Sequence, residues 1–355
     1  MKKIYLNILL IILTTFSATV HAEQGAEKFL DAMVEVRITV PENARTAERF
    51  GTNRVASGVV IDTTGHILTI GFQTIEAETV KIVRKDQETV NATVVAYDRH
   101  SGFGLLRATS PLEVTPMPLG NSMDVKEGDP VLAASYGYEG AVQGVRVVAR
   151  KEFAGSWEYL LENAIFTAPA IERFSGAALM DRNGHLVGIG YLFSQLEIAD
   201  MGLMPTNMFV PIDLLKPILS DLKLSGRSKL PTRPWLGVRT EEFYGRLVVE
   251  RIVSGSPSEK AGIKSGDIIL AVNKQKVNGM VDFFPQISAI LRNRDNRKIV
   301  AGHRQRYPHD DSPDDENPQY FRCVVDQVDH SLERKKMRGD IHLSNPRGLG
   351  AHIVG

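Results

Sequence analysis

Between residues 34 and 211 the chain repeats one pattern, in which short runs of valine, isoleucine and threonine alternate with turn residues such as Thr64-Gly65 and Asn183-Gly184. Short β-branched runs bounded by turn residues predict strands. The expected strands cover residues 34–40, 57–62, 66–70, 79–83, 89–96, 131–135, 142–150 and 186–192. They are too many for one small sheet, and closure into barrels removes exposed sheet edges. The sequence therefore predicts a mainly β protein built on closed barrels.

The charges and the single cysteine narrow the classes of function. Lysine and arginine together number 42, as do aspartate and glutamate, so the formal net charge is zero. Such a chain offers no basic field for phosphates, and we expect no nucleic-acid partner. Cys323 alone can form neither an internal disulfide nor a thiolate metal site. No cofactor and no metal site are expected.

The first residues have the features of a secretory signal. Lys2 and Lys3 precede an apolar stretch over residues 4–13, and small residues lead to a fitting cleavage site at Ala22. We expect a signal peptide over residues 1–22 and a periplasmic or otherwise exported mature protein. A membrane anchor is the alternative, but the apolar stretch would rise only about 15 Å as a helix, half of a bilayer core. We expect no membrane span in the mature chain.

The rest of the chain divides into a helix, a linker, a second unit and a tail. Apolar residues at helical spacing predict a helix within residues 211–224, and a polar, proline-containing stretch predicts a linker up to residue 234. The second unit is expected to hold strands at 247–253 and 267–273, a short helix ending at 261 and a helix at 281–291. Residues 292–355 carry many charges and little periodicity, which predicts no core of their own.

Two pairs of motifs carry a family resemblance. Residues 56–62 and then 65–69 follow the pattern GSGVIID..GYILTN, and residues 175–179 and then 184–189 follow SGGPLLN..GEVIGI. In this order and separation they resemble the HtrA-type, trypsin-like serine proteases with a C-terminal PDZ domain. The resemblance implies a chymotrypsin-like double β-barrel over residues 23–215, a helix and linker over 216–234, and an α+β PDZ domain over 235–291.

The catalytic residues that this resemblance implies are largely missing. A serine hydroxyl needs an imidazole to take its proton and a carboxylate to orient that imidazole. Ser175 occupies the nucleophile position, but Phe72 stands where ILTNNHVV has its histidine, and Gly102 where TDLAVLK has its aspartate. Arg173 replaces the glycine whose N–H helps to bind the oxyanion. Ser175 is therefore a candidate nucleophile only, and the positions of Phe72 and Gly102 are expected to be non-functional.

Histidine and lysine side chains elsewhere in the sequence are alternative candidates for the missing base. His66 and His185 occupy turn positions before strands, and we interpret them as solvated. His100 lies two residues before Gly102, near the former aspartate position, but we interpret it as a histidine of a surface loop. Lys151 could lie near Ser175, yet a lysine base needs burial to lower its pKa.

Trp235, Leu236, Gly237 and Val238 resemble the PDZ loop whose backbone N–H groups receive a peptide's C-terminal carboxylate. Successive amides around a glycine form an anion-binding concavity, and the peptide adds as a strand to the sheet edge. Residues 245–278 also match the PDZ pattern of turns and core positions.

The closing strands of the PDZ family have no evident counterpart after residue 291. Two explanations stay open. The tail is either natural and divergent, with no fold of its own, or the product of a reading-frame shift near residues 285–297, which would leave the PDZ domain truncated. We favour the reading-frame shift, because the change to a highly charged composition and the loss of the PDZ pattern begin at the same place in the chain.

A retained scaffold without the triad predicts an exported, HtrA-like pseudoprotease. It would bind unfolded proteins or peptide C-termini, as a chaperone or adaptor, without efficient cleavage. The alternative is an active periplasmic serine endopeptidase that uses Ser175 with an unrecognised base. A third hypothesis is a structural platform in an envelope assembly. The family commonly forms trimers through the protease domain, so the resemblance implies a homo-oligomer.

Overall fold

The computed structural model describes residues 30–137, 142–155, 160–198, 202–230, 236–272, 275–290, 299–303 and 321–325. Contacts within the chain define two compact units, and each is described by itself. The expected signal peptide, Trp235 and most of the tail lie outside the described residues. No helix in the described ranges is both long enough and apolar enough to cross a membrane.

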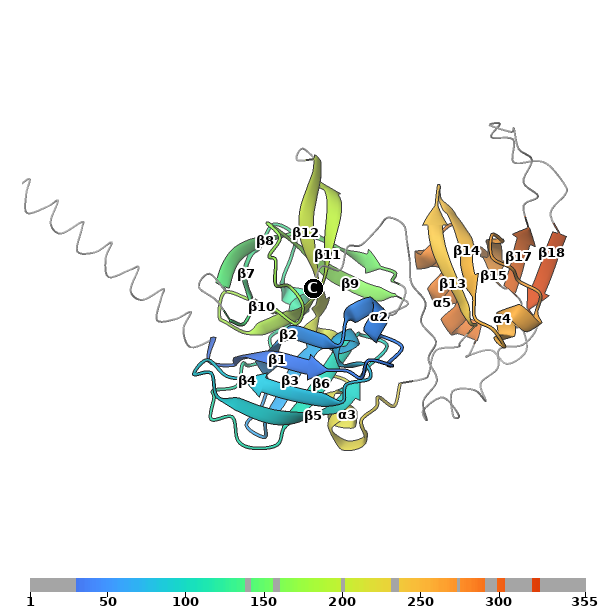
Figure 1. Ribbon diagram of the computed structural model, residues 1–355. Coiled ribbons are helices and arrows are strands. Elements are labelled where there is room, and N and C mark those ends of the chain that lie inside the picture. The colour runs from blue at the N-terminus through green and yellow to red at the C-terminus, as the bar shows by residue number, and fades with distance from the viewer. Residues whose placement is uncertain are drawn as a thin grey trace, which may run out of the picture. The chain divides into compact units, whose positions relative to one another are not determined.

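The first unit contains two closed β-barrels (Figure 1). In the first barrel the strands follow the order β1-β2-β3-β6-β5-β4. Its elements are β1 (Met33–Thr39), α2 (Ala47–Phe50), β2 (Asn53–Val60), β3 (His66–Ile70), the 3-10 turn η1 (Gly71–Thr74), β4 (Thr79–Val83), β5 (Thr89–Tyr97) and β6 (Phe103–Ala108). Val34, Val36 and Leu105 are fully buried. Burial of such apolar side chains is the main force that holds the barrel together.

The second barrel has the strand order β10-β11-β12-β9-β8-β7. Its elements are η2 (Ser122–Asp124), β7 (Pro130–Ala134), β8 (Val142–Phe153), β9 (Leu161–Ala168), β10 (Ala178–Met180), β11 (Leu186–Ile198) and β12 (Gly202–Pro211). β11 and β12 pair from Gly188 opposite Pro211 to Ile198 opposite Gly202, and their hairpin extends beyond the barrel (Figure 1). η3 (Ile212–Leu214) and α3 (Leu219–Ser225) follow.

The predicted mainly β class and double barrel are confirmed, and the strands predicted at 66–70 and 79–83 have the predicted bounds. The strands β6, β9, β10 and β12 were not among the expected ones. β10 is only three residues long, and β12 contains Pro205, which weakens a strand signal. The helix expected within residues 211–224 is shorter than predicted, because its first turn is the separate 3-10 turn η3.

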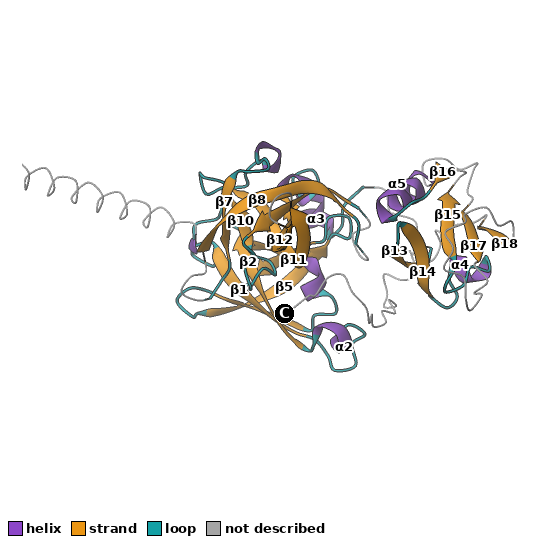
Figure 2. Cartoon of the chain, turned by 90° about the horizontal axis from the view of Figure 1, so that it is seen from above, coloured by secondary structure: helices purple, strands orange, loops and turns teal. Residues whose placement is uncertain are grey.

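The second unit is a sheet in the order β13-β14-β15-β17-β18, with β16 paired to β15 (Figure 2). Its elements are β13 (Val238–Phe243), β14 (Arg246–Ile252), α4 (Pro257–Lys260), β15 (Ile268–Val272), β16 (Gln275–Lys276), α5 (Met280–Ile290), β17 (Ile299–His303) and β18 (Phe321–Val325). Leu247, Ile269, Phe283 and Ile287 form its buried core together with Leu236. The core thus joins the sheet to α5, which packs against β13 and β15.

The expectation that no closing strand follows residue 291 is wrong. β17 pairs antiparallel with β15, and β18 pairs antiparallel with β17. Residues 299–301 are a very short apolar run between basic residues, so their strand signal was hidden by the surrounding charge. The rest of the tail lies outside the described residues, and the reading-frame shift stays a hypothesis.

Candidate active site

Ser175 lies in a tight turn of the second barrel, just before β10. The backbone N–H of Ser57 in β2 donates to the Ser175 carbonyl oxygen at 2.8 Å, so this turn is bonded to the first barrel. Gly176 has φ of 73°, and a Cβ at this position would overlap the Ser57 carbonyl oxygen. Glycine is therefore required after Ser175, both for the positive φ and for the close approach of two backbones. The turn presents a partly exposed serine at the contact of the two barrels.

Gln73 is the side chain that meets this serine. It lies in η1, directly after β3, and its Nε2 donates to Ser175 Oγ at 3.1 Å. A general base must accept the Oγ proton, whereas an amide nitrogen is a donor with no basic lone pair. The amide is buried, with 6% of Gln73 exposed. Ser175 therefore faces a hydrogen-bond donor in the place where catalysis needs a proton acceptor.

Phe72, at the expected histidine position, is part of an apolar cluster. It is 2% exposed, and its ring lies 5.3 Å from the Phe50 ring and 5.8 Å from the Tyr191 ring, measured between centroids. The Tyr191 ring meets it edge-on, which is a favourable aromatic arrangement. Phe72 therefore packs as a core residue.

Gly102, at the expected aspartate position, lies beside the start of η1. Its carbonyl oxygen accepts the N–H of Gly71 at 2.7 Å, and its φ is 83°. The nearby carboxylate of Asp98 is buried and accepts both the backbone N–H of Ser101, at 2.8 Å, and the Ser101 hydroxyl, at 2.6 Å. His100 lies in the same turn and is partly exposed. The three predicted triad positions thus come together around η1, but with phenylalanine in place of the imidazole base and glycine in place of the carboxylate that would orient it.

Arg54 of β2 holds η1 in place. Its guanidinium is buried and donates to the carbonyl oxygens of Gln73 at 3.2 Å and of Ile75 at 3.0 Å, and to Thr46 Oγ1 at 2.7 Å. Burial lowers the pKa of Arg54, while the charge of Glu76 raises it. An arginine guanidinium is effectively always protonated in proteins, so Arg54 carries a positive charge. Two of these three bonds hold the backbone that carries Gln73, and the third joins the same planar group to Thr46.

The oxyanion side of the site contains Arg173 where the family has glycine. The Arg173 carbonyl oxygen accepts the Ser135 hydroxyl at 2.7 Å. Next to Ser135, the N–H of Tyr136 donates to Ser57 Oγ at 3.0 Å. The backbone of residue 173 is thus tied to the strand end of β7 through its carbonyl group.

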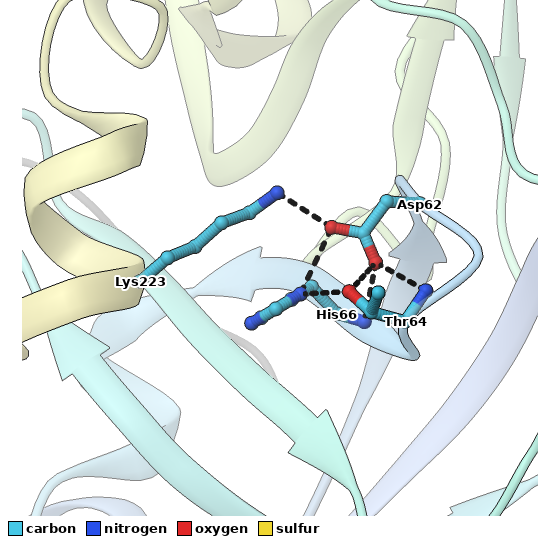
Figure 3. A network of polar contacts seen from close by, with 4 residues as sticks. All are labelled: Asp62, Thr64, His66 and Lys223. Carbon is cyan, nitrogen blue, oxygen red and sulfur yellow. Dashed lines mark hydrogen bonds and ion pairs between the residues drawn. The ribbon is translucent and has the colours of Figure 1, made fainter.

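His66 is not solvated, contrary to the expectation. It is the first residue of β3, is 7% exposed, and its Nδ1 lies 2.9 Å from Asp62 Oδ2 and 2.9 Å from Thr64 Oγ1 (Figure 3). Lys223 of α3 reaches the same carboxylate. His66 and η1 are at opposite ends of β3, about 16 Å apart at the rise of a strand. This histidine and carboxylate pair therefore fixes α3 to a turn and cannot serve Ser175.

His185 does occupy a turn position as expected. Its side chain is 43% exposed, and Nδ1 lies 3.3 Å from Asp181 Oδ2. In the described part of the chain, no histidine is hydrogen-bonded to Ser175 Oγ, and no group of three or more His, Cys, Asp or Glu side chains is placed to hold a metal ion.

The Lys223 contact to Asp62 predicts a pH-dependent contribution to stability. Burial alone would raise the pKa of Asp62, but hydrogen bonds from Lys223, Thr64 and the His66 backbone outweigh it and hold the pKa well below its ordinary value. A lowered folded-state pKa stabilises the protein above the ordinary pKa of about 3.9 and loses this effect as the pH falls. We expect Asp62→Asn to cost about 1 kcal/mol at pH 7, allowing for partial exposure, and progressively less below pH of about 4. Urea unfolding at pH 7, 5 and 3 measures it.

Asp181 provides the matched control, because its turn has the same Asp-x-x-Gly-His sequence. Asp181 pairs with the more exposed His185, so Asp181→Asn should have the smaller effect at pH 7. Equal losses for the two variants would contradict a specific role of Lys223.

The PDZ loop begins the edge strand of the second unit. Leu236 is buried, Gly237 has φ of 72°, and Val238 is the first residue of β13. The Gly237 carbonyl oxygen accepts the N–H of Val253 at 2.8 Å, and the Leu236 carbonyl oxygen accepts the N–H of Ser258 at 3.1 Å. The loop is thus anchored through its carbonyl groups, and Trp235 lies outside the described residues.

Comparison with known proteins agrees with this architecture. The family model of the trypsin-like peptidase domain matches residues 56–189, and that of the PDZ domain matches residues 234–298. The solved HtrA-type protease AlgW with tripeptide has a TM-score of 0.51 at 20% identity, covering 85% of this chain and 94% of AlgW. AlgW with decapeptide also gives 0.51 at 20% identity, covering 85% and 96%. At this identity the two structures support the fold.

Relatives found by sequence comparison are named as serine endoproteases. A probable periplasmic serine endoprotease DegP-like of Hahella chejuensis is 26% identical over 237 residues, which are 62% of this chain and 48% of the relative. The periplasmic serine endoprotease DegP of Salmonella typhimurium is 26% identical over 253 residues, 66% of this chain and 52% of that protein. The chain therefore spans about half the length of these relatives.

These observations define the class as a trypsin-like peptidase fold joined to a PDZ domain. Within that class the chain is similar to HtrA-type proteins, and the relatives that it matches are named as DegP or DegP-like periplasmic serine endoproteases.

Proposed function

We propose that this chain is an exported HtrA-type pseudoprotease, which binds unfolded proteins or exposed peptide C-termini without efficient cleavage. The observation that carries the proposal is the donation of the Gln73 amide to Ser175 Oγ, beside a buried phenylalanine. Loss of the base or nucleophile of a triad costs about 10⁶ in turnover, roughly 8 kcal/mol of barrier. The side chain hydrogen-bonded to Ser175 Oγ in the described structure is an amide donor, which cannot take the hydroxyl proton. The names of the relatives support a periplasmic location.

Peptide binding is assigned to the second unit. Leu236, Gly237 and Val238 lead into β13, which is an edge strand of the described sheet. An edge strand offers unpaired N–H and C=O groups to an incoming peptide. The structures of AlgW with tripeptide and with decapeptide support peptide binding in a protein of this fold. Trp235 is proposed as part of the same loop, and a homotrimer is proposed from the family resemblance.

An active serine endopeptidase remains the second candidate, favoured by the retained turn that presents Ser175 at the barrel contact. The test is incubation of the mature protein with denatured casein and, separately, with a fluorophosphonate probe, beside a Ser175→Ala control. We expect no serine-dependent cleavage and no serine-dependent labelling. Either signal, if lost in the control, would establish the endopeptidase and overturn the pseudoprotease.

The binding part of the proposal is tested separately with the full mature chain. A library of immobilised peptides with free C-termini, varied in the last three residues, would identify the preferred sequence. We expect saturable binding that is lost when the terminal carboxylate is amidated. If no peptide binds, the structural platform becomes the better description.

A further inference from the structure

The far end of the edge strand β13 is joined directly to the helix α5. Glu242, the fifth residue of β13, accepts the backbone N–H of Met280, the first residue of α5, on its Oε1. Gly279 precedes the helix, and a Cβ at this position would overlap the Glu242 carboxylate. The carboxylate therefore rests against the backbone at the helix start. We refer to this contact of Glu242 with Gly279 and Met280 as the clasp.

The helix does not need the clasp to begin. Asp282, in the first turn of α5, accepts the backbone N–H of Asn278 at 3.1 Å and the Asn278 side-chain amide at 3.0 Å. A carboxylate in the first turn that bonds the residues before the helix is a capping arrangement of its own. The clasp therefore adds a connection between two elements, the edge strand and the helix.

The clasp lies on the path of a bound peptide. Under the proposed function the terminal carboxylate binds at Leu236 to Val238, and the peptide extends antiparallel along β13. Glu242 follows Val238 by four residues, about 13 Å at the rise of a strand. An added strand would lie about 4.8 Å beyond β13. At the level of Glu242, the side chain of Glu242 itself already extends from β13 to the start of α5.

We propose that Glu242 limits the peptide site to about the last four residues of a free C-terminus. This proposal rests on the proposed peptide binding. It names the ligand class as short, exposed C-termini, because a longer or internal extended segment would have to displace the clasp. The carboxylate loop closes one end of the site, and the clasp closes the other.

The test compares a tripeptide with a decapeptide that share the preferred C-terminal sequence from the library, each titrated against the full mature chain. The wild type should bind the two with affinities within about two-fold of each other, because residues beyond the clasp add no strand pairing. Glu242→Ala removes the acceptor, and Gly279→Ala fills the place of the carboxylate. Both variants should bind the decapeptide at least about five-fold more tightly than the tripeptide, which corresponds to about 1 kcal/mol.

Two control variants separate the loss of the clasp from other effects of a substitution in β13 on peptide affinity. Glu242→Gln retains an acceptor oxygen at Oε1 and should behave as the wild type. Glu241→Ala removes the neighbouring exposed carboxylate and should also leave the ratio unchanged. The proposal would be overturned if the wild type itself bound the decapeptide more tightly than the tripeptide. It would also be overturned if the ratio of the two affinities stayed unchanged in both clasp variants, or if Glu241→Ala changed this ratio equally. Absence of any peptide binding would instead overturn the proposed function itself.

Discussion

Replacing Gly176 with alanine is expected to cost at least about 4 kcal/mol of barrel stability. The φ of 73° alone costs about 1–2 kcal/mol for a residue with a Cβ. The remainder arises because the new carbon overlaps the Ser57 carbonyl oxygen. To relieve this overlap, the Ser175 turn must move away from β2. It then loses the hydrogen bond that the Ser57 N–H donates to the Ser175 carbonyl oxygen.

Gly128→Ala is the matched control. Gly128 also has a positive φ, of 87°, but a Cβ there would meet nothing within 4 Å. It should cost only about 1–2 kcal/mol from backbone strain. Because the chain has two units, hydrogen exchange of peptides that cover β2 and β10 is a better measure than one global unfolding curve. Equal loss of protection in the two variants would show that the barrel contact does not depend on a glycine at 176.

Restoring an imidazole by Phe72→His is expected to destabilise the protein by about 3 kcal/mol without creating a protease. The new ring would lie in the aromatic cluster with Phe50 and Tyr191. Gly102 offers no carboxylate to orient the new imidazole. Gln73 would still donate to Ser175 Oγ. Thermal unfolding and casein cleavage are the two measurements.

Phe72→Leu keeps the site apolar and should cost less than Phe72→His, because it buries no unpaired polar atom. Casein cleavage by Phe72→His that disappears on adding Ser175→Ala would contradict this prediction. It would mean that a single histidine suffices for the missing chemistry.

The scaffold could be predicted from the sequence because some of its residues are forced by the backbone. Gly176 needs a positive φ and a close approach to Ser57, so the backbone itself requires a glycine after Ser175. The strands at 66–70 and 79–83 were found because they are apolar runs with clear turn residues at both ends. The β10 strand was missed because three residues show no periodicity.

The polar details of the site could not be predicted in the same way. Gln73 and Ser175 are separated by 102 residues, and only the turn η1, held by Arg54, brings the amide to the hydroxyl. The one available clue was that Gln73 is next to the expected histidine position. The burial of His66 was not expected because Lys223, which contacts the same Asp62 carboxylate, comes from a helix 157 positions after His66.

The direction of one hydrogen bond changes what the serine can offer. Since Ser175 Oγ accepts a hydrogen bond from Gln73, its own hydroxyl hydrogen is left for another acceptor. The Ser175 hydroxyl can therefore donate this hydrogen to a backbone carbonyl oxygen of another chain.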